Sequence, residues 1–164
     1  MTAIPPARSR VMSPAESGAF AAGARARGQR VVFTNGVFDL LHPGHTRYLD
    51  EARRLGDVLI VGLNSDQSVK RNKGAARPIT PEHERAELLA SLDSVDAVAI
   101  FGEDTPADII RLVLPDVLVK GADWPADQIV GRDTVEAHGG RVVLVAVEAG
   151  YSTTAILERI RRSR

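Results

Sequence analysis

The chain has 164 residues, and its 21 Lys and Arg residues balance 21 Asp and Glu residues, so the formal net charge is zero. Hydrophobic residues make up 44% of the sequence and cysteine is absent, which predicts a single domain with a sizeable core and excludes disulfide and thiolate chemistry. The charge balance argues against a nucleic acid or a membrane surface as partner, and no apolar run has the length of a membrane span.

The first residues show the pattern of neither a folded segment nor a secretory signal. Residues 1–12 contain two adjacent prolines and scattered arginines without a continuous apolar stretch, so we expect a loosely attached segment and a cytoplasmic protein. Residues 13–16 form a capping box with proline at the first helical position, which predicts a helix that ends near Gly28. Residues 1–29 are therefore interpreted as an N-terminal arm and helix, followed by one domain over residues 30–164.

Strands and helices alternate along the rest of the chain. Apolar and β-branched runs predict strands at residues 30–33, 58–63, 95–101, 117–119 and 141–147. Helical spacing and capping residues predict helices at residues 43–56, 80–92, 105–114, 128–137 and 152–161, and residues 70–79 are expected to be a basic loop. This alternation predicts an α/β fold with a Rossmann-like, mostly parallel sheet of about five strands flanked by helices. The glycine fingerprint of dinucleotide-binding domains and the P-loop motif are both absent.

The most informative segment joins the first of these strands to the following helix. Residues 34–45 read Thr-Asn-Gly-Val-Phe-Asp-Leu-Leu-His-Pro-Gly-His, and such a junction is where α/β sheets bind phosphate. Because His42 and His45 lie three residues apart around a helix N-terminus, both rings can face one phosphate chain and donate hydrogen bonds to it. Taken alone, a motif of four residues favours a surface Pro-Gly turn with incidental histidines, by roughly two to one. Zinc is not predicted, since His83 and His138 lack ligand spacing.

Three further polar segments follow later strands in the same way. Residues 64–66 (Asn-Ser-Asp), 120–124 (Lys-Gly-Ala-Asp-Trp) and 150–154 (Gly-Tyr-Ser-Thr-Thr) each occupy such a position. Together with residues 36–45, and in this order, they resemble the motifs of the cytidylyltransferase-like nucleotidyltransferase superfamily. The resemblance extends over about residues 30–160.

Within this superfamily the chain most resembles the heptose 1-phosphate adenylyltransferase branch. The segments that carry this likeness are residues 33–36, 62–66, 73–74, 77–78, 103–106 and 118–121. The resemblance implies an enzyme that joins ATP and D-glycero-β-D-manno-heptose 1-phosphate into ADP-heptose and pyrophosphate, for the inner core of lipopolysaccharide. It also implies a homodimer. In many organisms this activity is fused to a sugar kinase, and the short chain predicts the stand-alone form.

The same resemblance implies a role for individual residues. Catalysis is implied for His42, His45 and Lys73; nucleotide binding for Val37, Phe38, His42, His45, Asp123, Ser152, Thr153 and Thr154; and substrate binding for Asn64, Asp66, Arg77 and Lys120. Magnesium would enter bound to the triphosphate, so no metal site made of protein ligands is expected.

Two other functions stay open at this point. A cytidylyltransferase acting on glycerol phosphate or a related alcohol phosphate is disfavoured, because that branch carries an arginine where this chain has Val147. A non-catalytic nucleotide-binding module is disfavoured by the intact histidine pair and the hydroxyl-rich last motif. Three more residues stand near the motifs: Asp39 is expected to be structural, Trp124 is expected to pack, and Asp66 either binds magnesium through water or caps a turn.

Overall fold

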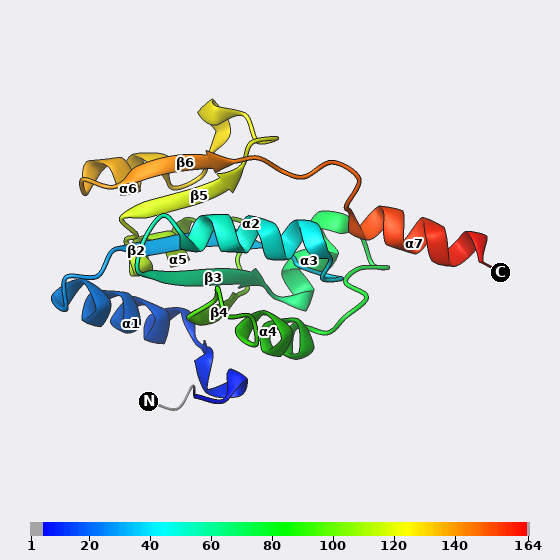
Figure 1. The fold of residues 1–164 in the computed structure, drawn as a ribbon, viewed down its shortest axis with the longest axis horizontal. Helices are drawn as coiled ribbons and strands as arrows, with labels where there is room; N and C mark the ends of the chain where they lie inside the picture. Colours follow the sequence, from blue (N-terminus) through cyan, green and yellow to red (C-terminus); the bar gives the residue numbers. More distant parts are fainter. Residues whose placement is uncertain (1–4, 164) are drawn as a thin grey trace.

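Six parallel strands form one sheet in the order β1-β4-β3-β2-β5-β6 (Figure 1). The computed structural model describes residues 5–163. The strands are β1 (Val11–Met12), β2 (Val31–Gly36), β3 (Val58–Asn64), β4 (Ala97–Phe101), β5 (Val117–Gly121) and β6 (Arg141–Val145). The helices are α1 (Pro14–Ala26), α2 (Pro43–Arg53), α3 (Asp66–Lys73), α4 (Glu82–Ala90), α5 (Ala107–Val113), α6 (Arg132–Ala137) and α7 (Thr153–Arg162), with 3-10 turns η1 (Ala7–Arg10) and η2 (Ala126–Gln128). The predicted Rossmann-like α/β fold is confirmed, with six strands in place of about five.

The additional strand comes from the N-terminal segment. β1 pairs with β4, placing Val11 opposite Val98, and Arg10 Nη1 donates to the Val95 carbonyl at 2.8 Å. The prediction of a loose segment over residues 1–12 is therefore wrong for residues 5–12, while residues 1–4 lie outside the described residues. A strand of two residues is too short to show the alternation by which strands are recognised.

Helix α3 is the other element that differs from expectation. Ser65 is its N-cap, and the Ser65 hydroxyl accepts a hydrogen bond from the Ser68 N–H at 3.2 Å. The predicted loop over residues 70–79 is thus wrong for residues 70–73, which complete the helix. Its C-cap Gly74 has a φ of 96°, a left-handed conformation that favours glycine and turns the chain out of the helix.

Side chains alternate between the two faces of the sheet and create two apolar cores. Val31 and Phe33 pack on one face, against residues of α1, α5 and α6. Val32, between them, packs on the other face, against α2 and α4. This period of two is the expected result of burying a parallel strand on both sides.

Three aspartates fix the amino ends of neighbouring strands. Asp57, Asp96 and Asp116 each directly precede a strand, and each carboxylate accepts a backbone N–H from the adjacent chain segment. The donors are Arg30, Leu59 and Val31, all at 2.7 Å. These aspartates therefore have a structural role at the amino ends of the strands.

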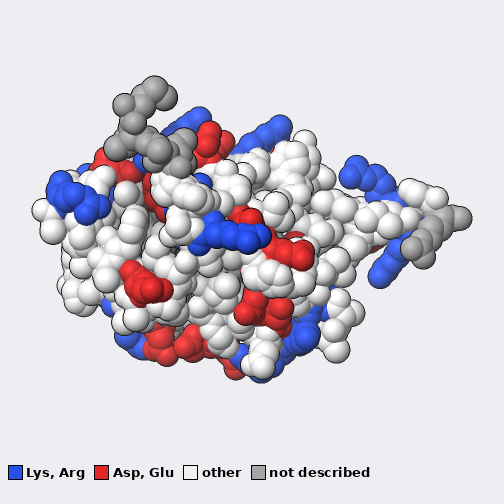
Figure 2. All heavy atoms as spheres, turned by 90° about the horizontal axis from the view of Figure 1, so that it is seen from below, with Lys and Arg blue, Asp and Glu red and all other residues white. Residues whose placement is uncertain are grey.

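At the opposite end, β2 lies between β3 and β5. The chain runs from β2 through β3 to β4 on one side of β2, and then crosses to β5 and β6 on the other side. Ligands of α/β proteins bind at such a switch point, outside the carboxyl ends of the strands. Helix α7 begins at this end and projects away from the body (Figure 1). Acidic and basic side chains are interspersed over the face seen in Figure 2. No helix within residues 5–163 is long and apolar enough to cross a membrane.

Candidate active site

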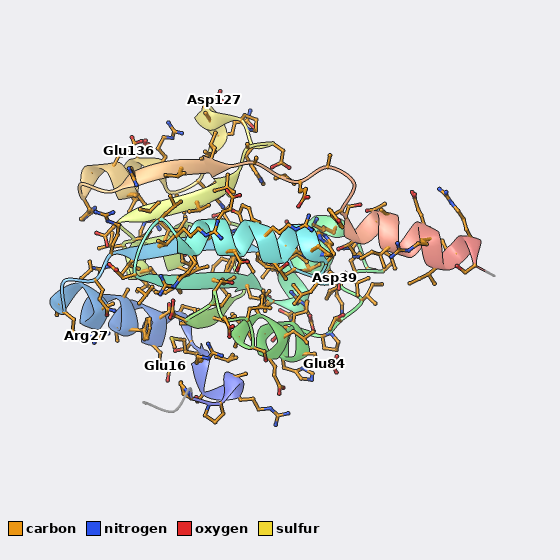
Figure 3. The ribbon with its side chains drawn as sticks, in the orientation of Figure 1. Glu16, Arg27, Asp39, Glu84, Asp127 and Glu136 are labelled. Carbon is orange, nitrogen blue, oxygen red and sulfur yellow. The ribbon has the colours of Figure 1, made fainter. Side chains whose placement is uncertain are left out.

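A cleft of about 530 Å³ opens at the carboxyl ends of β2, β3 and β5. The structure gathers every predicted site residue there except Asp66; the predicted residues in its wall are Val37, Phe38, His42, His45, Asn64, Lys73, Arg77, Lys120, Asp123, Ser152, Thr153 and Thr154. Segments far apart in the sequence thus meet at one site. Asp39, labelled in Figure 3, lies at this end of the sheet, near the start of α7.

The two histidines form a stacked pair at the start of α2. Their ring centroids lie 3.7 Å apart, with an angle of 16° between the planes. His42 is the N-cap of the helix, and its Nδ1 atom accepts a hydrogen bond from the His45 N–H at 3.3 Å. Because Nδ1 acts as an acceptor, the proton of neutral His42 resides on Nε2, which is then free to donate to a ligand.

Both imidazoles are held neutral by their surroundings. Burial lowers the pKa of His45 to about 4, and the adjacent His42 ring adds to this shift. Burial also lowers the pKa of His42. The Leu40 backbone partly opposes the shift of His45, yet among the described residues no group is placed to complete a hydrogen bond with its Nδ1 atom.

The lowered pKa of His45 predicts how folding stability depends on pH. Unfolded His45 binds a proton below about pH 6.5, whereas the folded residue binds one only below about pH 4. Between these values the unfolded state holds more protons, so the free energy of unfolding should fall as the pH drops from 6.5 toward 4. Urea denaturation at pH 7 and pH 5 measures this loss. The loss should be smaller in His45→Asn, and an equal loss in both proteins would contradict a neutral buried ring.

The start of α7 supplies hydroxyl groups to the same cleft. Ser152 caps the helix, its hydroxyl accepting from the Ala155 N–H at 3.0 Å, while Thr153 and Thr154 line the cleft beside it. A helix N-terminus with free N–H groups and hydroxyls favours an anion. The imidazoles and this helix end therefore present hydrogen-bond donors to the same cleft.

Lys120 contributes a buried positive charge at the end of β5. The residue is 8% exposed, its amine donates to Asn35 Oδ1, and its nitrogen lies 5.9 Å from the centre of the Trp124 ring. Burial lowers the pKa of this amine to about 8. Within residues 5–163 no carboxylate forms an ion pair with it. A buried cation without a counter-ion in a cleft wall is suited to an anionic ligand.

Asp39 serves the fold, as its position in the sequence suggested. Its carboxylate accepts from the backbone N–H groups of Ile79 and Thr80 and pairs with Arg77 Nε at 2.6 Å. Burial alone would raise its pKa, but the hydrogen bonds from Thr80, Ile79 and Arg77 outweigh burial and lower it. Arg77 lines the cleft while this bond holds it in place.

Asp66 has a different position from the one expected. Its Oδ1 atom pairs with Arg85 at 2.7 Å, and the residue does not line the cleft. Arg85 is 1% exposed and also donates to three backbone carbonyls, those of Val37, Asn64 and Thr80. This buried guanidinium therefore joins the segments that follow β2 and β3 to α4. Nothing in the sequence distinguishes it from the other arginines, most of which are on the surface.

Aromatic residues of the cleft were the least predictable from sequence. Trp124 was expected to pack, yet it is 53% exposed and lines the cleft. Tyr48 also lines it, and its hydroxyl lies 2.8 Å from Thr34 Oγ1. Tyr151 stacks near His42, and its place directly before Ser152 in the last motif was the available signal.

Metal ligands do not converge in the part of the chain that the structure describes, where no three His, Asp or Glu side chains are placed to hold a metal ion. Of the acidic groups nearest the cleft, Asp39 is engaged by Arg77, and Glu148 by Arg47. Asp123 is exposed and takes part in none of the ion pairs found within residues 5–163.

The model of the cytidylyltransferase-like family matches residues 33–159. The chain belongs to the cytidylyltransferase-like family. The matched residues include the histidine pair, Lys120 and the start of α7, so the family match covers the whole cleft.

Curated relatives share this part of the chain at high identity. Bifunctional protein HldE of Geotalea uraniireducens is 58% identical over 137 residues, 84% of this chain and 28% of that protein. Bifunctional protein HldE of Syntrophotalea carbinolica is 56% identical over 136 residues, 83% of this chain and 28% of that protein. The chain thus spans less than a third of the length of these relatives.

Solved structures support the same fold. The lipopolysaccharide core biosynthesis protein from Thermoplasma volcanium GSS1 superposes with a TM-score of 0.61 and 34% sequence identity, covering 74% of this chain and 98% of that one. A protein of unknown function from Archaeoglobus fulgidus has a TM-score of 0.55 at 21% identity, which supports the fold alone.

Proposed function

We propose that this chain is an adenylyltransferase that joins ATP and D-glycero-β-D-manno-heptose 1-phosphate into ADP-heptose and pyrophosphate, for the lipopolysaccharide inner core. The observation that carries the proposal is the stacked, neutral pair of His42 and His45, which lines one cleft together with the hydroxyl-bearing start of α7. The similarity to HldE proteins and to a lipopolysaccharide core biosynthesis protein supports the heptose substrate.

The chemistry that these residues support is an in-line displacement. An oxygen of the sugar phosphate attacks the α-phosphorus of ATP, a new P–O bond forms, and the bond to pyrophosphate breaks with its electron pair leaving on pyrophosphate. The attacking phosphate is largely dianionic near neutral pH, so no residue has to remove a proton from it. His42 and His45 would donate hydrogen bonds to phosphate oxygens that gain charge in the transition state.

The remaining residues of the cleft would hold the two substrates. Val37 and Phe38 would offer backbone N–H groups to phosphate, and Asp123 would hold the ribose hydroxyls. Asn64, Arg77 and Lys120 would bind the sugar phosphate, which Lys120 can do as a buried ammonium. Asp66 is left out of this set because it is engaged by Arg85.

Magnesium would enter as part of the substrate, bound to the triphosphate. The donor set supports this assignment, since the carboxylates nearest the cleft are mostly paired with arginines and do not converge on one point. The ion would neutralise charge on the triphosphate.

A panel of nucleotides and acceptors tests the proposed function. Pyrophosphate release is measured with ATP, CTP, GTP or UTP against heptose 1-phosphate and glycerol 3-phosphate. We expect release with ATP and heptose 1-phosphate. Val147 lines the cleft at the position where the glycerol-phosphate cytidylyltransferase branch carries an arginine. CTP with glycerol 3-phosphate should therefore release little pyrophosphate. Release from that pair instead would assign the chain to the alternative branch, and nucleotide binding without any release would make it a binding module.

Replacing Lys73 should weaken the handling of the triphosphate. Lys73 is the last residue of α3, exposed to solvent and in the wall of the cleft. Loss of one charge-assisted hydrogen bond to phosphate lowers kcat/KM by about tenfold or more. We therefore expect Lys73→Ala to lower kcat/KM for ATP by at least that factor with an unchanged melting temperature. Lys70→Ala, one turn earlier and outside the cleft, is the matched control. An unchanged kcat/KM in Lys73→Ala would remove the assigned role.

Two further expectations accompany this function. We infer a homodimer and a cytoplasmic location, where ATP is available as substrate. Light scattering of the purified chain at several concentrations tests the dimer, since a mass equal to one chain at all of them would contradict it.

A further inference from the structure

The segment that carries the start of α7 has few connections to the rest of the molecule. No residue of α7 is buried, and within residues 5–163 no hydrogen bond or ion pair joins residues 153–162 to the body. In Figure 1 the helix projects beyond the end of the sheet. A groove of about 410 Å³ separates residues of α7 from the segment before α2. The hydroxyls of the last motif must therefore be placed by something other than helix packing.

Tyr151, directly before the N-cap of α7, provides a contact between this segment and the body of the molecule. Its ring stacks near the His42 ring, with centroids 6.2 Å apart and 22° between the planes. His42 in turn stacks on His45, whose other neighbour is the edge-on ring of Phe38 at 5.2 Å. Tyr151 is thus the outermost member of a continuous column of four rings that runs into the cleft.

The backbone around Tyr151 is fitted closely to the first turn of α2. A Cβ atom placed on Gly44 would lie 2.9 Å from Tyr151 Cβ and 3.0 Å from His42 Nδ1, so only glycine admits this approach. Gly150, directly before the tyrosine, has a φ of 90°, which turns the chain toward α2. One turn along α2, Arg47 lies 5.5 Å from the tyrosine ring and also pairs with Glu148.

We propose that Tyr151 is a positioning residue that holds the first turn of α7 against the histidine pair, so that Ser152, Thr153 and Thr154 act on the same phosphate chain as His42 and His45. The inference rests on the proposed function, because it takes a nucleoside triphosphate as the ligand. Tyr151 is proposed to act through the His42 ring and the start of α7, and no contact with the reacting atoms is assigned to it. Its removal should affect the binding of the triphosphate more than the chemical step.

Two variants distinguish the contribution of the Tyr151 ring from that of the Tyr151 hydroxyl. Tyr151→Phe keeps the stacked ring, whereas Tyr151→Ala removes it. We expect Tyr151→Ala to raise KM for ATP about tenfold and to lower kcat less than about threefold, because loss of uniform binding raises KM alone. Tyr151→Phe should stay within about twofold of the parent in both constants. Glu148→Gln removes the ion pair with Arg47, the other connection between this segment and α2. It should raise KM for ATP less than Tyr151→Ala does, since that ion pair is exposed. An unchanged KM in Tyr151→Ala, or a larger effect of Glu148→Gln, would overturn the proposal.

Hydrogen exchange makes the test independent of turnover. Without ligand, the hydrogen-bonded amides of Ala155 and Ile156 should exchange at least about threefold faster in Tyr151→Ala than in Tyr151→Phe, while α4 and α5 exchange alike and report an intact fold. Equal exchange of α7 in the two variants would refute the positioning role. On adding ATP, the same amides should be protected in the parent and in Tyr151→Phe, and protected less in Tyr151→Ala. If ATP protects no part of the parent chain, the proposed function fails, and the comparison without ligand still decides the role of Tyr151.

Discussion

Replacing His45 with alanine should lower turnover by at least about a hundredfold, the usual cost of losing one donor to a charge that develops in the transition state. The His45 ring is held neutral in the cleft wall and stacked on His42, and its Nδ1 atom has no partner within the described residues. Its removal leaves the N-cap of α2 in place, because that cap is His42. The change should therefore act on kcat and leave the fold intact, as measured by pyrophosphate release and circular dichroism.

Two other histidine variants serve as controls for this result. His83→Ala removes an imidazole from α4, where the side chain is 76% exposed and outside the cleft, and it should leave turnover unchanged. His42→Asn keeps an oxygen that can cap α2 but removes the Nε2 donor, so it should lose turnover without losing stability. Normal turnover in His45→Ala would refute the role assigned to the pair.

Replacing Arg85 with methionine should cost about 3 kcal/mol of folding free energy, the range found when one partner of a buried ion pair is removed. Methionine preserves the apolar length of the side chain but leaves Asp66 and the carbonyls of Val37, Asn64 and Thr80 without their donor. The bond to the Asn64 carbonyl is buried and cannot be replaced by water, whereas the Asp66 side chain is 31% exposed and can be hydrated in part. Urea denaturation measures the difference in stability.

Matched variants distinguish this network from a general effect of removing charge. Arg111→Met removes an exposed arginine whose side chain is 62% accessible, and it should change stability by less than about 0.5 kcal/mol. Arg85→Lys retains the charge but cannot reach all four acceptors, so its stability should lie between those of the parent and Arg85→Met. A loss below about 1 kcal/mol in Arg85→Met would show that the segments around the cleft do not depend on this guanidinium.

The fold was predictable because strong local signals coincide with the pattern of burial. The apolar run of β3 is buried at every residue, as expected of a strand covered on both faces, and the capping box at Ser13 does begin α1. β1 was missed because it consists of two residues at the edge of the sheet. α3 was missed because its basic residues resemble a loop, although Ser65 and Asp66 form a recognisable helix start.

The candidate site was predictable where a motif directly follows a strand. It was less predictable where side chains from distant segments meet only in the folded chain. The carboxyl ends of parallel strands share one edge, which is why residues near positions 42, 73, 120 and 152 line one cleft. The sequence does not reveal that Asp66 faces Arg85 and not the cleft, because that pairing depends on where α4 packs. The stacking of Tyr151 on His42 also joins segments more than a hundred residues apart, and no local pattern encodes it.

The central claim is that this cleft transfers an adenylyl group from ATP to a sugar phosphate. Phosphorus-31 NMR of the purified chain with magnesium, ATP and D-glycero-β-D-manno-heptose 1-phosphate follows every phosphorus atom in one experiment. The account predicts that the signals of ATP and of the sugar phosphate decline together, while pyrophosphate and the two coupled signals of a sugar nucleotide appear in equal amounts. Release of orthophosphate with ADP, or an unchanged spectrum in the presence of folded protein, would contradict it.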